Sequence, residues 1–206
     1  MYLNRKWITL ILITLSFSAT AQISVDNTIT PEDVVNMLVG EGILVSNISY
    51  EGDLNQFGSF ENTGDQMGIA NGVILATGDC VVAIGPNSSG SMSQGGGNSS
   101  SNSSLPGDPG DIDLEAISGV NTNDNAVLEF DFVPAGDSLK FFYVFGSEEY
   151  DDYECCSVND AFGFFVSGPG ITGPYSSPAG FPDGSINIAR VPGTDIGVSI
   201  NTVNSA

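Results

Sequence analysis

The chain has 206 residues and a formal net charge of −21, because 25 acidic residues outnumber four basic ones, and it contains no histidine. A surface this acidic repels nucleic acid and anionic lipid, so neither is expected as a partner. Without histidine the chain cannot form Ser–His or Cys–His nucleophile pairs or ordinary histidine-containing zinc sites. Most familiar hydrolase mechanisms are thereby excluded, although a pair of carboxylates of the glycosidase type is not.

The N-terminus has the order of segments that directs a protein to export. Arg5 and Lys6 precede an apolar run over residues 7–17, and small residues at positions 18–21 complete a cleavage site. The apolar run is too short to span a membrane as a helix, so no membrane insertion is expected. The pattern predicts a signal peptide at residues 1–21, a secreted or cell-surface location, and a single β-rich domain at residues 22–206.

Three cysteines, Cys80, Cys155 and Cys156, lie in the exported part, where oxidation is expected. Adjacent cysteines seldom bond to each other, because the ring that they close is strained. A disulfide from Cys80 to either Cys155 or Cys156 is therefore favoured. Free thiols, or a bond to a cysteine beyond residue 206, are the alternatives.

A short amphipathic helix is expected near the start of the mature chain. Thr30 is a suitable N-cap, Pro31 suits the first helical position, and acidic residues follow in the first turn. Apolar residues at positions 34, 35, 38 and 39 share one face, and Gly40 ends the segment. Its polar face carries no Lys or Arg, so this helix should pack on a sheet and not on a membrane.

The rest of the chain is predicted to form short β-strands separated by Gly, Asn, Asp and Pro. Apolar and acidic residues alternate over residues 127–133, which predicts a strand with one buried and one wet face. Residues 139–145 are apolar on both faces apart from Lys140, which predicts a central strand. A mainly β fold follows: a two-sheet sandwich, jelly-roll-like, with one short N-terminal helix. The expected strands are residues 43–50, 73–77, 81–84, 127–133, 139–145, 161–166, 186–191 and 196–203.

Two stretches have another character. Residues 85–111 are rich in Ser, Gly and Asn and are predicted to form a flexible loop inside the one domain. The chain ends at Ala206 soon after a β-like run. We therefore expect the domain to be truncated at its C-terminus and to be followed by further domains of the same protein.

A dense acidic loop lies between two apolar segments, at residues 148–160. It contains no cation, so its carboxylates repel one another unless they point into water or bind a metal ion. Ca²⁺ takes about six to eight oxygen ligands, and the candidate ligands are Glu148, Glu149, Asn159 and Asp160. The alternative is a solvated acidic loop screened by salt. Residues 121–126 also begin like a calcium loop, but Ala126 stands where the sharp turn requires glycine.

Aromatic residues cluster around this acidic loop. Phe141, Tyr143 and Phe145 have the spacing of a strand and are expected in the core. Tyr150 and Tyr153 lie in the loop itself, and for them a role in a sugar-stacking surface is an alternative to packing in the core.

Two sequence blocks flank the acidic residues: Phe-Gly-Ser-Glu-Glu-Tyr at residues 145–150 and Asn-Asp-Ala-Phe-Gly-Phe at residues 159–164. With these blocks the chain resembles the choice-of-anchor L domain family of secreted and surface proteins, common in gliding bacteria. The resemblance implies a non-catalytic, largely β extracellular module, often at the N-terminus of a longer protein that ends in a gliding-associated or sorting domain. Further matching blocks lie at residues 38–40, 45–50, 72–78, 128–132, 167–169, 187–189 and 191–194.

Two functions follow from these observations. The first is an extracellular adhesion or interaction module at the cell surface, without enzymatic activity, stabilised by Ca²⁺ and linked to gliding or surface attachment. Its ligand would be an extracellular protein or a glycan. The alternative is a carbohydrate-binding module or a carboxylate-dependent glycan-active domain.

Overall fold

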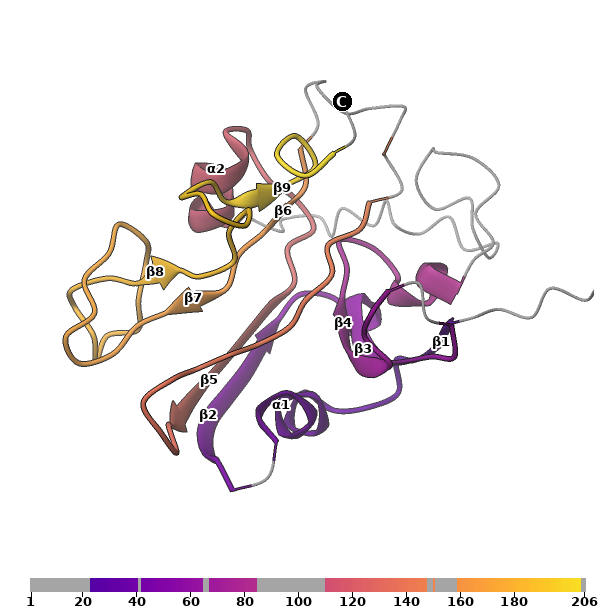
Figure 1. The fold of residues 1–206 in the computed structure, drawn as a ribbon, viewed down its shortest axis with the longest axis horizontal. Coiled ribbons are helices and arrows are strands. Elements are labelled where there is room, and N and C mark those ends of the chain that lie inside the picture. Colours follow the sequence, from indigo (N-terminus) through magenta and orange to yellow (C-terminus); the bar gives the residue numbers. More distant parts are fainter. Residues whose placement is uncertain are drawn as a thin grey trace, which may run out of the picture.

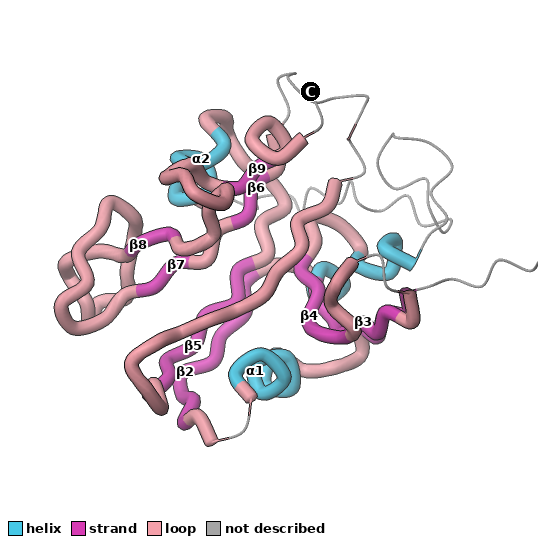
Figure 2. Tube along the Cα trace, in the orientation of Figure 1, coloured by secondary structure: helices cyan, strands magenta, loops and turns pink. Residues whose placement is uncertain are grey.

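The computed structural model describes residues 23–40, 42–64, 67–84, 110–147, 150 and 159–204. Within these residues the protein is mainly β, with small antiparallel sheets and two α-helices (Figures 1 and 2). The predicted mainly β class is thus confirmed, but the predicted two-sheet sandwich is not seen, because the described strands form separate sheets of two or three strands. The predicted signal peptide, and the predicted loop up to residue 109, lie outside the described residues.

The N-terminal sheet has the order β1-β3-β4 and is antiparallel throughout. Its strands are β1 (Ile23–Asp26), β3 (Phe57–Asn62) and β4 (Asn71–Leu75). The central strand β3 buries Phe57 and Phe60, which are 2% and 8% exposed. Neither β1 nor β3 was expected from the sequence, because Gly and Ser interrupt their apolar residues, yet β3 supplies much of this core.

Helix α1 (Pro31–Val39) begins where the sequence predicts. The Thr30 hydroxyl accepts a hydrogen bond from the Asp33 amide at 3.2 Å, and the Asp33 carboxylate accepts one from the Thr30 amide at 3.1 Å. This reciprocal capping box satisfies amides that the first turn leaves without partners. The helix buries Val34 and Val35 completely. It follows β1 in the chain, so it is not the first element. The structure also contains a second helix, α2 (Ile112–Ser118), which the sequence did not predict.

A long two-stranded ribbon pairs β2 (Leu44–Glu51) with β5 (Val127–Val133) in antiparallel register. In β5 the side chains of Glu129 and Asp131 are exposed and the neighbouring apolar residues are half-buried, as the alternation predicts. In Figure 1 the N-terminal sheet and α1 lie on one side of this ribbon, and α2 with the remaining strands lies on the other.

The C-terminal region contains two minimal sheets. Strand β6 (Ala161–Phe162) pairs with β9 (Val198–Ser199), and β7 (Phe165–Val166) pairs with β8 (Ile186–Asn187). The predicted strands at residues 161–166, 186–191 and 196–203 are therefore present only as two-residue pieces. Turns, side-chain hydrogen bonds and an isolated antiparallel bridge between Arg190 and Gly197 take up the rest of these segments.

Two strand predictions are wrong. Residues 81–84 belong to a 3₁₀-helix, η2 (Cys80–Ile84), because the Asp79 carboxylate accepts a hydrogen bond from the Val81 amide at 3.1 Å and holds the chain in a tight turn. Residues 139–145 are extended but are not part of any sheet among the described residues. None of the described helices is long and apolar enough to cross a membrane.

Candidate functional site

Only two of the four predicted calcium ligands fall within the described residues. Glu148 and Glu149 lie outside them, whereas Asn159 and Asp160 lie immediately before β6. The backbone oxygen of Asp160 accepts a hydrogen bond from the Ile200 amide at 3.0 Å, which fixes its main chain against the segment after β9. The structure therefore holds the second end of the acidic loop on the C-terminal sheets.

Asn159 has a structural role. Its side-chain amide donates to the Ser118 oxygen at 2.6 Å, at the end of α2, and its amide oxygen accepts from the Asn201 backbone amide at 3.0 Å. The residue is only 9% exposed. One buried side chain thus joins α2 to the turn after β9, and its oxygen is already engaged. Calcium ligation by Asn159 stays a prediction.

The carboxyl group of Asp160 has a partner that sequence reasoning missed. Burial raises the pKa of Asp160 above its ordinary value, and the negative charge of Asp124 raises it further. Asp124 comes from the segment before β5 and has a φ angle of +53°, a left-handed conformation that Asp tolerates better than most residues. The charge of one carboxyl group thus acts on another that is 36 residues away in the sequence, and we call these two residues the acidic pair Asp124–Asp160.

A buried glutamine positions the Asp124 end of this pair. Gln56, 5% exposed, donates from its side chain to the Asp124 backbone oxygen at 2.7 Å and to the Thr77 oxygen at 3.3 Å. Its own side-chain oxygen accepts from the Asp53 amide at 2.7 Å. The N-terminal sheet and the segment before β5 are thus joined by one side chain.

The approach is close enough to require glycine at position 52. Gly52 has a φ angle of +136°, and a Cβ atom there would lie 2.8 Å from the Asn125 backbone oxygen, the Gln56 Oε1 atom and the Tyr50 hydroxyl oxygen. Real Cβ atoms do not approach oxygen this closely, so a side chain would push the segment before β5 away from Gln56. Gly52 and Gln56 together set where Asp124 lies.

The acidic pair by itself does not complete a calcium site. Two carboxylates offer four oxygens, fewer than the roughly six to eight that Ca²⁺ prefers. Among the described residues there is no group of three or more acidic, cysteine or histidine side chains that could hold a metal ion. Any further carboxylates would have to come from the acidic loop, which lies outside the described residues. The sequence signal for Asp124 was the interrupted calcium-like pattern at residues 121–126.

The aromatic side chains near the loop pack against one another. The Phe141 ring stacks on Phe164 with centroids 4.1 Å apart, and Tyr143 lies 5.3 Å from Phe162. The Tyr143 hydroxyl donates to the Arg190 backbone oxygen at 3.1 Å. Phe141, Tyr143 and Phe145 are half-buried and not part of the fully buried core, so the predicted core position is not seen, although Phe141 and Tyr143 pack against other aromatic rings.

Cys80 is buried, 1% exposed, and its thiol is free in the structure. Burial, with a smaller contribution from the charge of Asp79, raises the pKa of the Cys80 thiol to about 11. The predicted disulfide from Cys80 is therefore not seen, and Cys155 and Cys156 lie outside the described residues.

Comparison with known proteins identifies one family. The sequence profile of the choice-of-anchor L domain matches residues 22–206, which is nearly the whole chain. No curated protein and no solved structure is significantly similar to it. The family is one of extracellular and cell-surface proteins, in agreement with the location predicted from the N-terminus. The chain belongs to the choice-of-anchor L domain family.

Proposed function

We propose that this chain is a non-catalytic extracellular interaction module of a larger exported protein, and that a bound Ca²⁺ ion stabilises it. The observation that carries the proposal is the Asp124–Asp160 pair: both residues are half-buried, and the charge of Asp124 adds to burial in raising the pKa of Asp160. Family membership supports an extracellular surface role. The module would serve adhesion, surface attachment or gliding by binding an extracellular protein or glycan.

The physical argument for a cation is one of charge balance. Like charges brought together in a partly buried place destabilise the folded state unless a proton or a cation neutralises one of them. Residues 22–206 contain only two basic residues, Lys140 and Arg190, and Arg190 forms an ion pair with Asp195. A divalent ion bound by Asp124 and Asp160, together with Glu148 and Glu149 of the acidic loop, would supply positive charge to these carboxylates.

Thermal unfolding with and without the ion tests this proposal. At a Ca²⁺ concentration about a hundredfold above Kd the stabilisation is about 2.7 kcal/mol. In a domain of this size that corresponds to a rise in Tm of about 5–10 °C. Mg²⁺ should have a smaller effect, because it loses its water ligands reluctantly. An unchanged Tm on adding Ca²⁺ or a chelator would remove the metal from the proposal.

Matched variants locate the ion. Asp160→Asn and Asp124→Asn should each abolish most of the Ca²⁺-dependent rise in Tm, whereas Asp137→Asn, at an exposed position in the turn after β5, should leave it intact. A Ca²⁺ response that survives at full size in Asp160→Asn and Asp124→Asn would place the ion elsewhere. The interaction role has its own assay: beads coated with the exported chain should attach to the surface of the producing cells more than beads coated with an unrelated acidic domain.

The alternative is a glycan-active or glycan-binding domain, and the same acidic pair favours it. Glycosidases use two carboxyl groups, of which one donates a proton and the other acts as base or nucleophile. On this alternative Asp160→Asn would abolish release of reducing sugar without lowering Tm. Blank results in both a reducing-sugar assay and a glycan array would end it.

A further inference from the structure

The segment at residues 138–146 follows the turn after β5 and lies beside the C-terminal sheets without joining one. Among the described residues, none forms a backbone hydrogen bond with this segment. Toward the described part of the chain, the amide and carbonyl groups of these nine residues are therefore unpaired. An extended chain with unpaired backbone groups is a template for another strand.

One face of this segment is anchored. Phe141 stacks on Phe164, Tyr143 packs against Phe162, and the Tyr143 hydroxyl donates to the Arg190 oxygen at 3.1 Å. These contacts hold the segment extended along the protein surface. A strand that is already extended loses little conformational entropy when a partner pairs with it.

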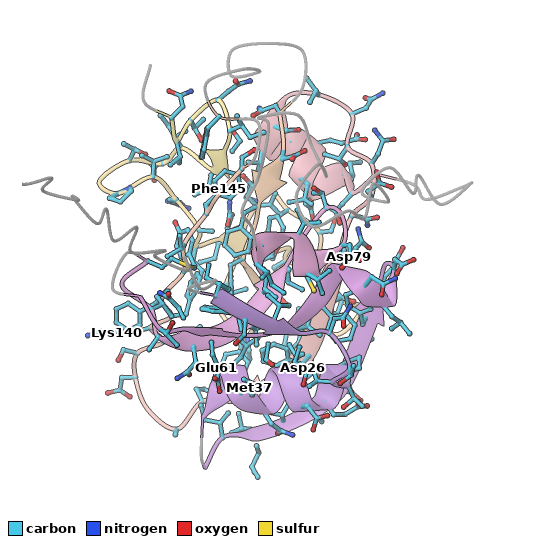
Figure 3. The ribbon with its side chains drawn as sticks, turned by 90° about the vertical axis from the view of Figure 1, so that its right-hand side faces the viewer. Asp26, Met37, Glu61, Asp79, Lys140 and Phe145 are labelled. Carbon is cyan, nitrogen blue, oxygen red and sulfur yellow. The ribbon has the colours of Figure 1, made fainter. Side chains whose placement is uncertain are left out.

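The opposite face carries Lys140, Phe142 and Val144. Phe142 is 87% exposed and Val144 is 50% exposed, so their apolar surface is in water. Lys140 is exposed and forms no ion pair with any described residue, although the chain contains 25 acidic residues. In Figure 3 Lys140 lies at the periphery of the molecule, whereas Phe145 lies nearer its middle.

We propose that residues 138–146 accept an extended peptide strand of another protein, whose side chains place a carboxylate opposite Lys140 and apolar groups opposite Phe142 and Val144. Backbone pairing supplies the affinity, and the alternate side chains define the register. The net charge of −21 disfavours a second copy of this chain as the occupant, because two such chains repel each other. This inference deepens the proposed interaction role and rests on it.

A designed peptide tests the acceptor strand. Acetyl-Thr-Val-Thr-Phe-Thr-Glu-Thr-amide, paired antiparallel, aligns its Val, Phe and Glu with Val144, Phe142 and Lys140. Hydrogen exchange should slow by at least about tenfold at alternate amides of residues 139–145, those on the paired edge, when the peptide binds. Exchange that stays unchanged at every amide of residues 139–145 under saturating peptide would overturn the proposal.

Charge reversal makes the test specific. Lys140→Glu should weaken binding of the Glu peptide by about fivefold or more, and a peptide with Lys in place of Glu should regain affinity for this variant. Phe142→Ser should weaken binding by more than about tenfold, because the aromatic contact is lost. Leu54→Ser, at another exposed apolar position, serves as the control. Equal affinity for the wild-type chain, Lys140→Glu and Phe142→Ser would contradict the proposed strand.

Sedimentation velocity decides between the occupants. The chain without peptide should remain monomeric; a dimer that Phe142→Ser dissociates would make a second copy the occupant and overturn the proposal. None of these measurements depends on Ca²⁺ or on attachment to cells. If cell attachment persists in Lys140→Glu and Phe142→Ser, the strand-acceptor inference fails while the interaction role stands.

Discussion

The N-terminal and C-terminal regions of this domain are stabilised in different ways. The sheet β1-β3-β4 with α1 buries apolar side chains: Val34 and Val35 are fully buried and Phe57 is 2% exposed. The region of α2 and β6 to β9 has strands of two residues each, and buried amides connect them. Asn187, 2% exposed, accepts from the Phe164 amide at 3.1 Å and from the Ala189 amide at 2.9 Å.

The contrast shows how very short strands can persist. Asn159 and Asn187 satisfy backbone groups that a longer ladder would otherwise pair, so each amide takes the place of missing strand–strand bonds. Apolar burial depends mainly on area and tolerates small shifts, whereas a hydrogen-bonded tie depends on direction and distance. The first region should therefore lose most stability when volume is removed, and the second when one polar side chain is removed.

The largest effect is expected in the apolar region. Phe57→Ala removes a buried ring that lies 4.5 Å from the Tyr50 ring, centroid to centroid, and should lower the free energy of unfolding by about 3–5 kcal/mol. Urea denaturation followed by circular dichroism measures the loss. Leu54→Ala, where the side chain is 66% exposed, should change stability by less than about 0.5 kcal/mol. Similar losses in both variants would contradict an apolar core at β3.

The next effect is expected in the region joined by amides. Asn159→Ala removes the partner of the Ser118 backbone oxygen, which is buried, and of the part-buried Asn201 backbone amide, at a cost of about 2–4 kcal/mol in total. Denaturation should be measured in chelator, so that any lost metal does not contribute. Asn123→Ala, at an exposed position, is the control and should be nearly neutral. A neutral Asn159→Ala would show that polar ties do not stabilise this region.

A smaller effect is expected at the start of α1. Thr30→Ala removes the hydroxyl that caps the helix and should cost about 1 kcal/mol. Thr30→Ser retains the hydroxyl and should recover most of that loss. If Thr30→Ser were as unstable as Thr30→Ala, the methyl group and not the cap would be responsible.

The same cap has a pH dependence. The Thr30 hydroxyl donates a hydrogen bond to the Asp33 carboxylate and, with a smaller effect, so does the Thr30 backbone amide. Both bonds hold the pKa of Asp33 below its ordinary value of 3.8. Because the unfolded chain then binds the proton more readily, this contribution is complete above pH 3.8 and is lost as the pH falls through the folded pKa. Thr30→Ala should therefore flatten the decline of stability below pH 3.8. An identical slope in both proteins would contradict this linkage.

The smallest effect is a labelling rate and not a change in stability: the reactivity of the Cys80 thiol should report on opening of the N-terminal region. At pH 8 its raised pKa and burial should make labelling by a thiol reagent far slower in the native chain than in denaturant, in a variant with Cys155→Ser and Cys156→Ser. In the wild-type chain unfolded without reductant, three reactive thiols would match the free Cys80 of the structure. A single reactive thiol would show one disulfide, and peptide mapping that finds the label on Cys155 or Cys156 would support the Cys80 disulfide predicted from the sequence.

Predictions from the sequence succeeded where the signal was local. The Thr30-Pro31 start of α1 depends on side chains that reach only the next turn, and the alternation in β5 depends on neighbours in one strand. They failed at residues 81–84, where the Asp79 carboxylate favours a 3₁₀-turn over a strand. They also missed β3, whose Gly58 and Ser59 weaken the strand pattern although its aromatic residues are buried. At the candidate site, Asp160 was named in advance, but its partner Asp124 was not.

The sequence by itself determined the family, the mainly β class and the helix cap, because short blocks of residues and nearest-neighbour periodicity carry that information. Only the tertiary structure decided that the charge of Asp124 acts on Asp160, that Gln56 holds the Asp124 segment, and that residues 138–146 pair with no described strand. Those relations join segments tens of residues apart. They depend on which distant backbone groups find partners, and no local pattern of side chains records that choice.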